Sequence, residues 1–246
     1  MSLRDRLVFD CGALKGKAGC TITEAEKLVA TMGDKVGWIK LDQDFFSRGH
    51  ELAQRVKEMG CRLWLDGINW ENSINALKKY ATEGAGADMF NVYSASGFEV
   101  MRHVKARAEE LFSSGLKKKR PLIVAFTILT NLYRSQHEHF SDLDDRVLSL
   151  AWLAKHAGLD GVVVSPLEAK IIRKELGYDL LIIASSVRFA EEAKGGQIKV
   201  VTPKEAIANG ADIVVMGTSL INGGLPAVDR AYKEIEAGLR MRMKSF

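Results

Sequence analysis

GLDGVVVSPLEAKIIRKELGYDLLIIAS, residues 158–185, contains one strand–helix–strand unit. Its two ends, DGVVVS and DLLIIAS, are short runs rich in β-branched and apolar residues, which is typical of buried strands. Between them apolar residues recur three and four positions apart, with Lys, Glu and Arg on the other face, as in an amphipathic helix. Gly177 follows this helical pattern at the place of a C-cap. The stretch therefore predicts a buried strand, a surface helix and a second buried strand.

The same order recurs along the whole chain of 246 residues. Eight apolar runs precede helical segments and are predicted as strands: 6–10, 36–42, 61–66, 87–93, 121–129, 160–165, 179–185 and 211–217. An open doubly wound sheet usually has a GxGxxG turn after its first strand, which CGALKGKAG at 11–19 does not match. The pattern predicts an α/β fold, a TIM (β/α)8 barrel forming a single domain over 1–246, with 1–3 a candidate cloning remnant.

Composition narrows the functional class. The chain is 47% hydrophobic and 27% charged, with a formal net charge of +4, so no nucleic-acid partner is indicated. The basic run at 117–120 is interpreted as a solvated loop. No apolar run reaches the roughly 18 residues of a membrane span. Three cysteines without CxxC spacing argue against disulfides and zinc, and a cytoplasmic location is expected.

Polar residues end several of the predicted strands, and the chemistry of a TIM barrel takes place at those ends. Each such residue alone could be a helix cap, and Ser165 before PLEAKIIRKEL is a good example. Lys40 and Asp66 are harder to explain as caps. Two opposite charges at the ends of neighbouring strands would be partly desolvated in the barrel mouth, and pairing with each other offsets that cost. We expect Asp10, Lys40 and Asp66 to converge at the carboxyl-terminal mouth of the barrel.

Four stretches carry a resemblance to a known family: 127–131 (TILTN), 158–177, 182–189 (IIASSVRF) and 199–217. In order and spacing they resemble the orotidine 5'-monophosphate decarboxylase family, and the similarity covers nearly the whole chain. The family keeps an Asp on strand one and a Lys on strand two, where this chain has Asp10 and Lys40. The resemblance implies a carboxy-lyase of pyrimidine nucleotide biosynthesis that uses neither a cofactor nor a metal ion.

The third-strand motif of that family, Asp-x-Lys-x-x-Asp, departs at one position in this chain. It becomes DGINWE at 66–71, so Asp66 is kept, Glu71 replaces the last Asp and Ile68 replaces the proton-donating Lys. The resemblance thus implies Lys40, Asp66 and Glu71 as catalytic residues. Because Ile68 has no ionisable proton, we expect slow decarboxylation or none.

The remaining site residues are also carried over from the family. Thr218 follows Gly217 where the family has Arg, and Ser185 and Ser186 replace its usual Pro-Gly, while an Arg and a Gln near the phosphate are retained. Tyr93 stands where the family has His. The implied substrate-binding residues are Asp10, Thr127, Asn131, Ser186, Arg188, Gln197, Gly217 and Thr218.

Three readings stay open on sequence alone. The first is a decarboxylase of this type acting on a nucleotide. The second is a barrel that has lost decarboxylation and binds a phosphorylated metabolite. The third is one of the sister sugar-phosphate enzymes, which use magnesium and also require the missing Lys. The family resemblance further implies a homodimer in which Glu71 reaches the partner's site and Trp70 lies in the loop that crosses the interface.

Overall fold

A computed structural model describes residues 1–16, 22–42, 50–66, 86–115, 120–128, 143–192 and 201–245. Its eight strands are all parallel and form a closed barrel in chain order, which confirms the predicted fold. They are slightly shorter than the predicted runs: β1 Leu7–Asp10, β2 Trp38–Asp42, β3 Arg62–Asp66, β4 Met89–Tyr93, β5 Leu122–Phe126, β6 Gly161–Val164, β7 Leu181–Ala184 and β8 Ile213–Met216.

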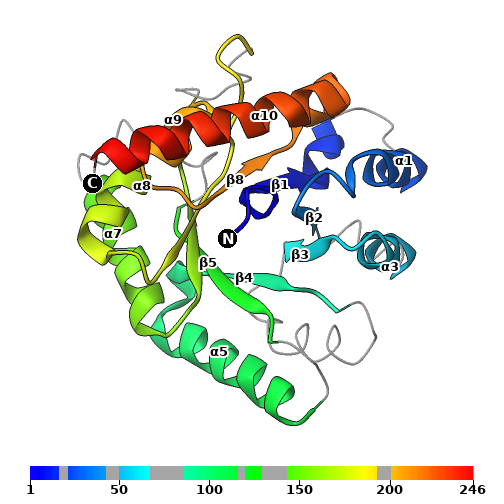
Figure 1. Ribbon diagram of the computed structural model, residues 1–246. Coiled ribbons are helices and arrows are strands. Elements are labelled where there is room, and N and C mark those ends of the chain that lie inside the picture. The colour runs from blue at the N-terminus through cyan, green and yellow to red at the C-terminus, as the bar shows by residue number, and fades with distance from the viewer. Residues whose placement is uncertain are drawn as a thin grey trace.

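The helices lie outside the strands, and Figure 1 shows them around the ring. The described α-helices are α1 Ile22–Met32, α3 His50–Glu58, α5 Phe98–Ser113, α7 Leu143–His156, α8 Ala169–Leu176, α9 Pro203–Ala208 and α10 Thr218–Ser245; three short 3-10 helices are η1 Arg4–Arg6, η2 Cys11–Gly16 and η4 Ser94–Ser96. Helix α10 bends at Gly224, where φ is 59°, just before Pro226. None of the described helices combines the length and apolar character needed to cross a membrane.

Alternation along the strands separates two layers of buried side chains. One set points into the barrel and packs as a single cluster: Val8, Trp38, Trp64, Met89, Val124, Phe126, Val163, Ile183, Ile213 and Val215. Residues of the other parity pack between the strands and the surrounding helices. Because side chains on a strand alternate with a period of two, the residues that continue the inner set upward must enter the mouth of the barrel. Asp10, Lys40 and Asp66 continue it in this way.

Three aspartates hold strands together at the opposite end of the barrel. Asp88, Asp160 and Asp212 stand immediately before β4, β6 and β8. Each carboxylate accepts the backbone N–H of the preceding strand, from Leu63, Ile123 and Ile182, at 2.8–3.0 Å. A basic side chain pairs with each one: Lys57 with Asp88, Lys105 and Arg120 with Asp160, and Arg173 with Asp212.

Arg173 is the most deeply buried of these cations, with a side chain that is 0% exposed. Its guanidinium donates to the carbonyl oxygens of Gly177, Leu180 and Gly210 at 2.7–3.2 Å, and to the carboxylate of Asp212. These contacts connect α8 with the starts of β7 and β8. The planar guanidinium suits such a site because it presents five N–H donors in a fixed arrangement.

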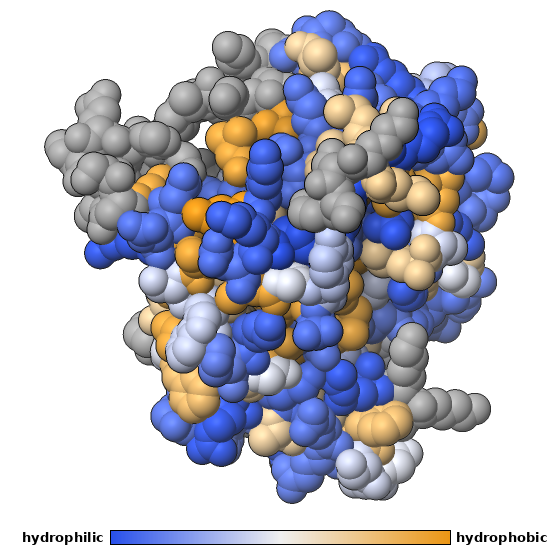
Figure 2. Space-filling model, turned by 60° about the vertical axis from the view of Figure 1, so that its left-hand side comes forward, coloured by the Kyte–Doolittle hydropathy of each residue, from blue (hydrophilic) through white to orange (hydrophobic). Residues whose placement is uncertain are grey.

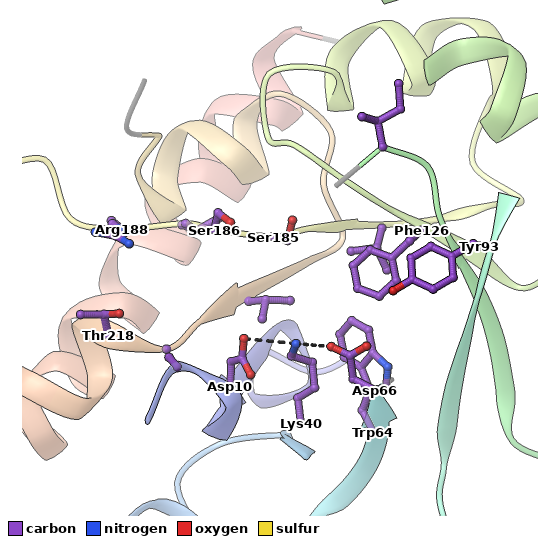
Figure 3. A pocket seen from close by; sticks show the side chains of 16 residues that line it. Asp10, Lys40, Trp64, Asp66, Tyr93, Phe126, Ser185, Ser186, Arg188 and Thr218 are labelled. Carbon is purple, nitrogen blue, oxygen red and sulfur yellow. Dashed lines mark hydrogen bonds and ion pairs between the residues drawn. The ribbon is translucent and has the colours of Figure 1, made fainter. Parts of the chain in front are cut away.

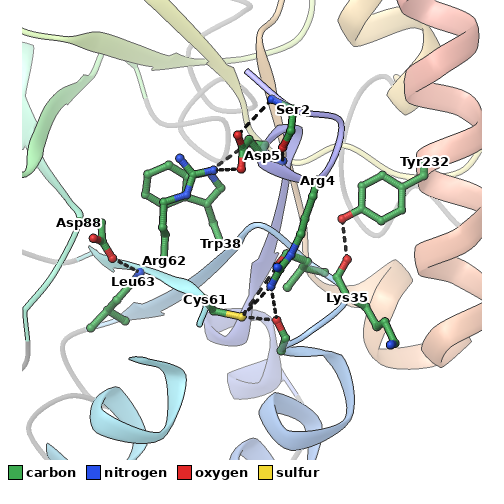
Figure 4. Close-up of polar contacts among 12 residues, drawn as sticks. Ser2, Arg4, Asp5, Lys35, Trp38, Cys61, Arg62, Leu63, Asp88 and Tyr232 are labelled. Carbon is green, nitrogen blue, oxygen red and sulfur yellow. Dashed lines mark hydrogen bonds and ion pairs between the residues drawn. The ribbon is translucent and has the colours of Figure 1, made fainter. Parts of the chain in front are cut away.

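The amino-terminal segment makes polar contacts at the barrel end away from the mouth, and Figure 4 shows those of Ser2, Arg4 and Asp5. Arg4 donates to the carbonyl oxygens of Val36 and Gly33, at 2.9 and 3.2 Å. The guanidinium carbon of Arg62 lies 3.9 Å from the ring centroid of Trp38, and Arg62 also pairs with Asp5. This end is thus filled by side chains that pair with one another, which indicates a structural role.

The face of the molecule shown in Figure 2 is mostly hydrophilic, with hydrophobic residues in smaller patches.

Candidate functional site

Lys40 lies between two carboxylates at the mouth of the barrel (Figure 3). Its Nζ is 3.2 Å from Asp10 Oδ2 and 2.5 Å from Asp66 Oδ2. The three residues come from β1, β2 and β3, three consecutive strands of the barrel. Their side chains are only 11–23% exposed, so the charges are partly withdrawn from water. The structure therefore brings together the three residues expected to converge there.

The pKa values in this cluster follow from burial and charge. Burial alone lowers the pKa of Lys40, but the carboxylates of Asp10 and Asp66 outweigh it, and the pKa is raised well above its ordinary value. The pKa of Asp10 is raised, because burial and the charge of Asp66 together outweigh the lowering by Lys40 and by the hydrogen bond from Gly12. Lys40 consequently stays an ammonium at every physiological pH. It can stabilise negative charge, but it is a poor proton donor.

These side chains line a cavity of about 290 Å³, here called the mouth cavity. It is lined by Asp10, Ala13, Lys40, Trp64, Asp66, Tyr93, Phe126, Ile128, Val163, Ser185, Ser186, Val187, Arg188, Val215, Gly217 and Thr218. Figure 3 shows aromatic side chains on one side of the charged cluster and Arg188, Ser186 and Thr218 on the other. The cavity can thus hold a ligand with an apolar planar part and an anionic part.

Three aromatic residues form the apolar side of the mouth cavity. The ring centroids of Trp64 and Phe126 are 6.4 Å apart, and those of Tyr93 and Phe126 are 5.9 Å apart. Trp64 is held from below, because its Nε1 donates to Oδ1 of buried Asn91 at 3.0 Å. Planar ligand rings pack well on aromatic faces.

The opposite side of the mouth cavity has the features of an anion site. Arg188 supplies a guanidinium, and Thr218 begins helix α10, where backbone N–H groups point outward. Ser186 has φ of 62°, a left-handed conformation unusual for a residue with a side chain. Glycine adopts this backbone conformation freely. This fits the Pro-Gly that the decarboxylase family has where this chain has Ser185 and Ser186. A Cβ at Gly217 would lie 2.4 Å from that of Ala13, so only glycine allows β8 to approach η2 this closely.

Most of the described site candidates line the mouth cavity, namely Asp10, Lys40, Asp66, Ser186, Arg188, Gly217 and Thr218. Thr127 does not, because its hydroxyl donates to the carbonyl of Val163 at 3.3 Å while its neighbours Phe126 and Ile128 line the cavity. Side chains alternate along an extended chain, so Thr127, next to inward-facing Phe126, points away from the lumen. Glu71, Asn131 and Gln197 lie outside the described residues, as do Ile68 and Trp70.

Trp64, Phe126 and Asp42 were not singled out from the sequence. Trp64 and Phe126 both belong to the inner cluster, and the sequence shows the alternation along each strand but not which of the two sets of side chains faces the lumen. Asp42 pairs in register with Asp66 at the end of β2. A Cβ on Gly12 would lie 3.1 Å from a carboxylate oxygen of both Asp10 and Asp42, so a third carboxylate stands close to the charged cluster.

Replacing Lys40 with Met should make stability depend on pH. The variant leaves Asp10 and Asp66 without their shared cation, which should cost about 2 kcal/mol at pH 8, less than for a fully buried pair. The pKa of Asp10 is already raised in the folded protein and should rise further. A carboxyl with a raised folded pKa favours unfolding above that pKa, so stability should return as the pH falls toward its unfolded value.

Melting temperatures at pH 8 and pH 5 test this expectation. Lys40→Met should gain more on acidification than the wild-type protein does. Lys35→Met is the matched control, since that lysine is 53% exposed and pairs with neighbouring Asp34. An identical pH response in all three proteins would show that Lys40 does not compensate the two carboxylates.

Comparison with known proteins agrees with this geometry. A profile of the orotidine 5'-phosphate decarboxylase / HUMPS family matches residues 19–231. The orotidine 5'-phosphate decarboxylase of Syntrophotalea carbinolica is 33% identical over 96% of this chain and 97% of its own length. Among solved structures, the Lactobacillus acidophilus decarboxylase has a TM-score of 0.69 at 24% identity, covering 95% of this chain and 100% of its own.

A second solved structure shows the same fold at lower identity. The orotidine 5'-monophosphate decarboxylase of Methanocaldococcus jannaschii, complexed with the inhibitor BMP, has a TM-score of 0.69 at 17% identity, covering 94% of this chain and 98% of its own. The profile match and the identity to the Syntrophotalea protein decide the relationship. This chain belongs to the orotidine 5'-phosphate decarboxylase / HUMPS family.

Proposed function

We propose that the mouth cavity binds a pyrimidine nucleoside monophosphate and that the protein is an orotidine 5'-monophosphate decarboxylase-type enzyme with little decarboxylase activity. The observation that carries this proposal is Lys40 held between Asp10 and Asp66 inside the mouth cavity. The aromatic residues would pack against the pyrimidine, and Arg188, Ser186 and Thr218 would hold the phosphate. The name of the Syntrophotalea relative, orotidine 5'-phosphate decarboxylase, supports a phosphorylated ligand.

The low activity follows from the charges the reaction requires. Loss of CO2 from the pyrimidine leaves a carbanion without a conjugated sink, so the site must stabilise negative charge and supply a proton. Lys40 can do the first, since Asp10 and Asp66 keep it an ammonium, but the family takes the proton from the lysine of its third-strand motif. That lysine corresponds to Ile68 in this chain. We therefore expect binding to be retained better than turnover.

A family member that binds a phosphorylated metabolite without decarboxylating it is the second candidate function. Ile68 favours it, as does Thr218 in place of the family's Arg, since a hydroxyl binds phosphate more weakly than a guanidinium. Under either function, a homodimer with Glu71 contributing to the partner's site and a cytoplasmic location stay predictions. Cys11 and Cys61 are buried and form no disulfide among the described residues, which suits a reducing compartment.

Calorimetry with uridine monophosphate tests the proposed ligand class. We expect binding by the wild-type protein, and a tenfold or greater loss of affinity in Arg188→Met, because a charge-assisted hydrogen bond contributes about 1.5–3 kcal/mol. Arg102→Met is the control, since Arg102 is 60% exposed and pairs with Glu99 on α5. Absence of heat and of any melting-temperature shift at millimolar nucleotide would contradict the proposal. Binding of phosphorylated sugars instead would favour the second candidate.

A further inference from the structure

Tyr93 ends β4 with its ring in the mouth cavity. The ring lies against Phe126, and in Figure 3 the hydroxyl is on the side of the Asp66 carboxylate. The residue is half-buried, and no described side chain accepts a hydrogen bond from its hydroxyl. Tyr93 thus presents an O–H group to the same space as the charged cluster.

The other groups along the mouth cavity are poor proton donors. Among its described lining residues, Lys40 is held as an ammonium by Asp10 and Asp66, whose carboxylates are engaged in those ion pairs, and a guanidinium is a far weaker acid than a phenol. The hydroxyls of Ser185, Ser186 and Thr218 are much weaker acids than a phenol. Tyr93 is therefore the strongest neutral acid among the described lining residues that is not engaged in an ion pair.

The electrostatic surroundings keep this hydroxyl protonated until a strong base, such as a carbanion, forms beside it. Burial and the charge of Asp66 raise the pKa of Tyr93, and Lys40 partly offsets them. The phenol is thus fully protonated at neutral pH. Once the proton has left, the phenolate would lie within the field of the Lys40 ammonium, whose charge acts on this phenol in the folded protein.

We propose that Tyr93 is the proton donor of this family member, supplying the proton that the family's third-strand lysine supplies elsewhere. The inference rests on the proposed function, since it assumes that orotidine monophosphate occupies the mouth cavity. The bond from the ring carbon to the carboxylate breaks, CO2 leaves, and the electron pair stays on that carbon. The Tyr93 O–H transfers its proton to the carbon, and the resulting phenolate takes a proton from water when the product leaves.

Single-turnover decarboxylation of orotidine monophosphate with Tyr93→Phe tests the assignment. Proton transfer by a positioned side chain commonly contributes about 100-fold or more, so Tyr93→Phe should lower the rate by about 100-fold. The affinity for uridine monophosphate should change by less than about threefold, because the ring that packs on the ligand is kept. Tyr178→Phe, which removes the hydroxyl of a tyrosine that is 61% exposed and outside the mouth cavity, should keep the wild-type rate.

Two further measurements distinguish a proton donor from a merely structural tyrosine. The wild-type rate should fall as the pH rises through the pKa of Tyr93, and this alkaline decrease should be absent in Tyr93→Phe. In an Ile68→Lys background a second donor is present, so Tyr93→Phe should cost less than about tenfold there.

The outcomes separate the two proposals. If the protein binds uridine monophosphate but Tyr93→Phe keeps the wild-type rate, or the wild-type protein shows no turnover at all, Tyr93 is not the donor and the proposed ligand class stands. If no nucleotide binds, the proposed function fails and the assignment of Tyr93 fails with it.

Discussion

Ile68→Lys should raise the rate of orotidine monophosphate decarboxylation by about 100- to 1,000-fold, roughly 3–4 kcal/mol of transition-state stabilisation. The substitution restores the lysine of the family's Asp-x-Lys-x-x-Asp motif beside Asp66 and Glu71. Side chains two apart on an extended chain project to the same side, so we expect the new ammonium to project to the side of Asp66. That carboxylate would hold it where the carbanion forms.

The control for this experiment is Ile68→Met, which has a flexible side chain of similar volume but no charge. It should leave the rate unchanged, so that any gain in Ile68→Lys is due to the ammonium. Initial rates can be followed by the loss of pyrimidine absorbance. Robust turnover by the wild-type protein would contradict the reading of Ile68 as a lost catalytic position. A folded Ile68→Lys variant that binds uridine monophosphate and remains inactive would contradict the expected rescue.

Arg173→Met should lower the free energy of unfolding by about 3–5 kcal/mol, although Arg173 is at the opposite end of the barrel from the mouth cavity. Its guanidinium is fully buried, pairs with Asp212 and donates to three backbone carbonyls. A methionine fills similar space but leaves Asp212 and those carbonyls without these donors. For a chain of this length, such a loss corresponds to a fall of roughly 10 °C in melting temperature.

Lys174→Met provides the matched control on the same helix. Lys174 is 79% exposed, so its replacement should change stability by less than about 0.5 kcal/mol. Denaturant unfolding of the three proteins measures both effects. A loss below about 1 kcal/mol in Arg173→Met would show that the buried contacts of Arg173 contribute little to stability.

The eight strands and their order could be predicted from the sequence. Each is a short apolar run before a helical pattern, and a parallel barrel buries both faces of its strands, so the runs are unusually clear. The predicted strand at 121–129 ends at Phe126 instead, since hydrophobicity alone does not mark where pairing stops. The sequence also pointed to Asp10, Lys40 and Asp66, because charges at strand ends stand out against apolar runs. That Ile68 replaces a catalytic lysine stays a prediction from the family motif.

Only the tertiary structure decided which side of each strand enters the lumen. Thr127 was expected at the ligand, but Phe126 and Ile128 line the mouth cavity, because a shift of one residue reverses the direction of a side chain. The aspartates before β4, β6 and β8 likewise resemble ordinary turn residues in the sequence. The structure shows that each accepts a backbone N–H of the preceding strand. Local sequence patterns determine which segments become strands, since they depend on near neighbours. Closure of the barrel determines which way each side chain points and which residues it contacts, since both depend on strands that are far apart in the chain.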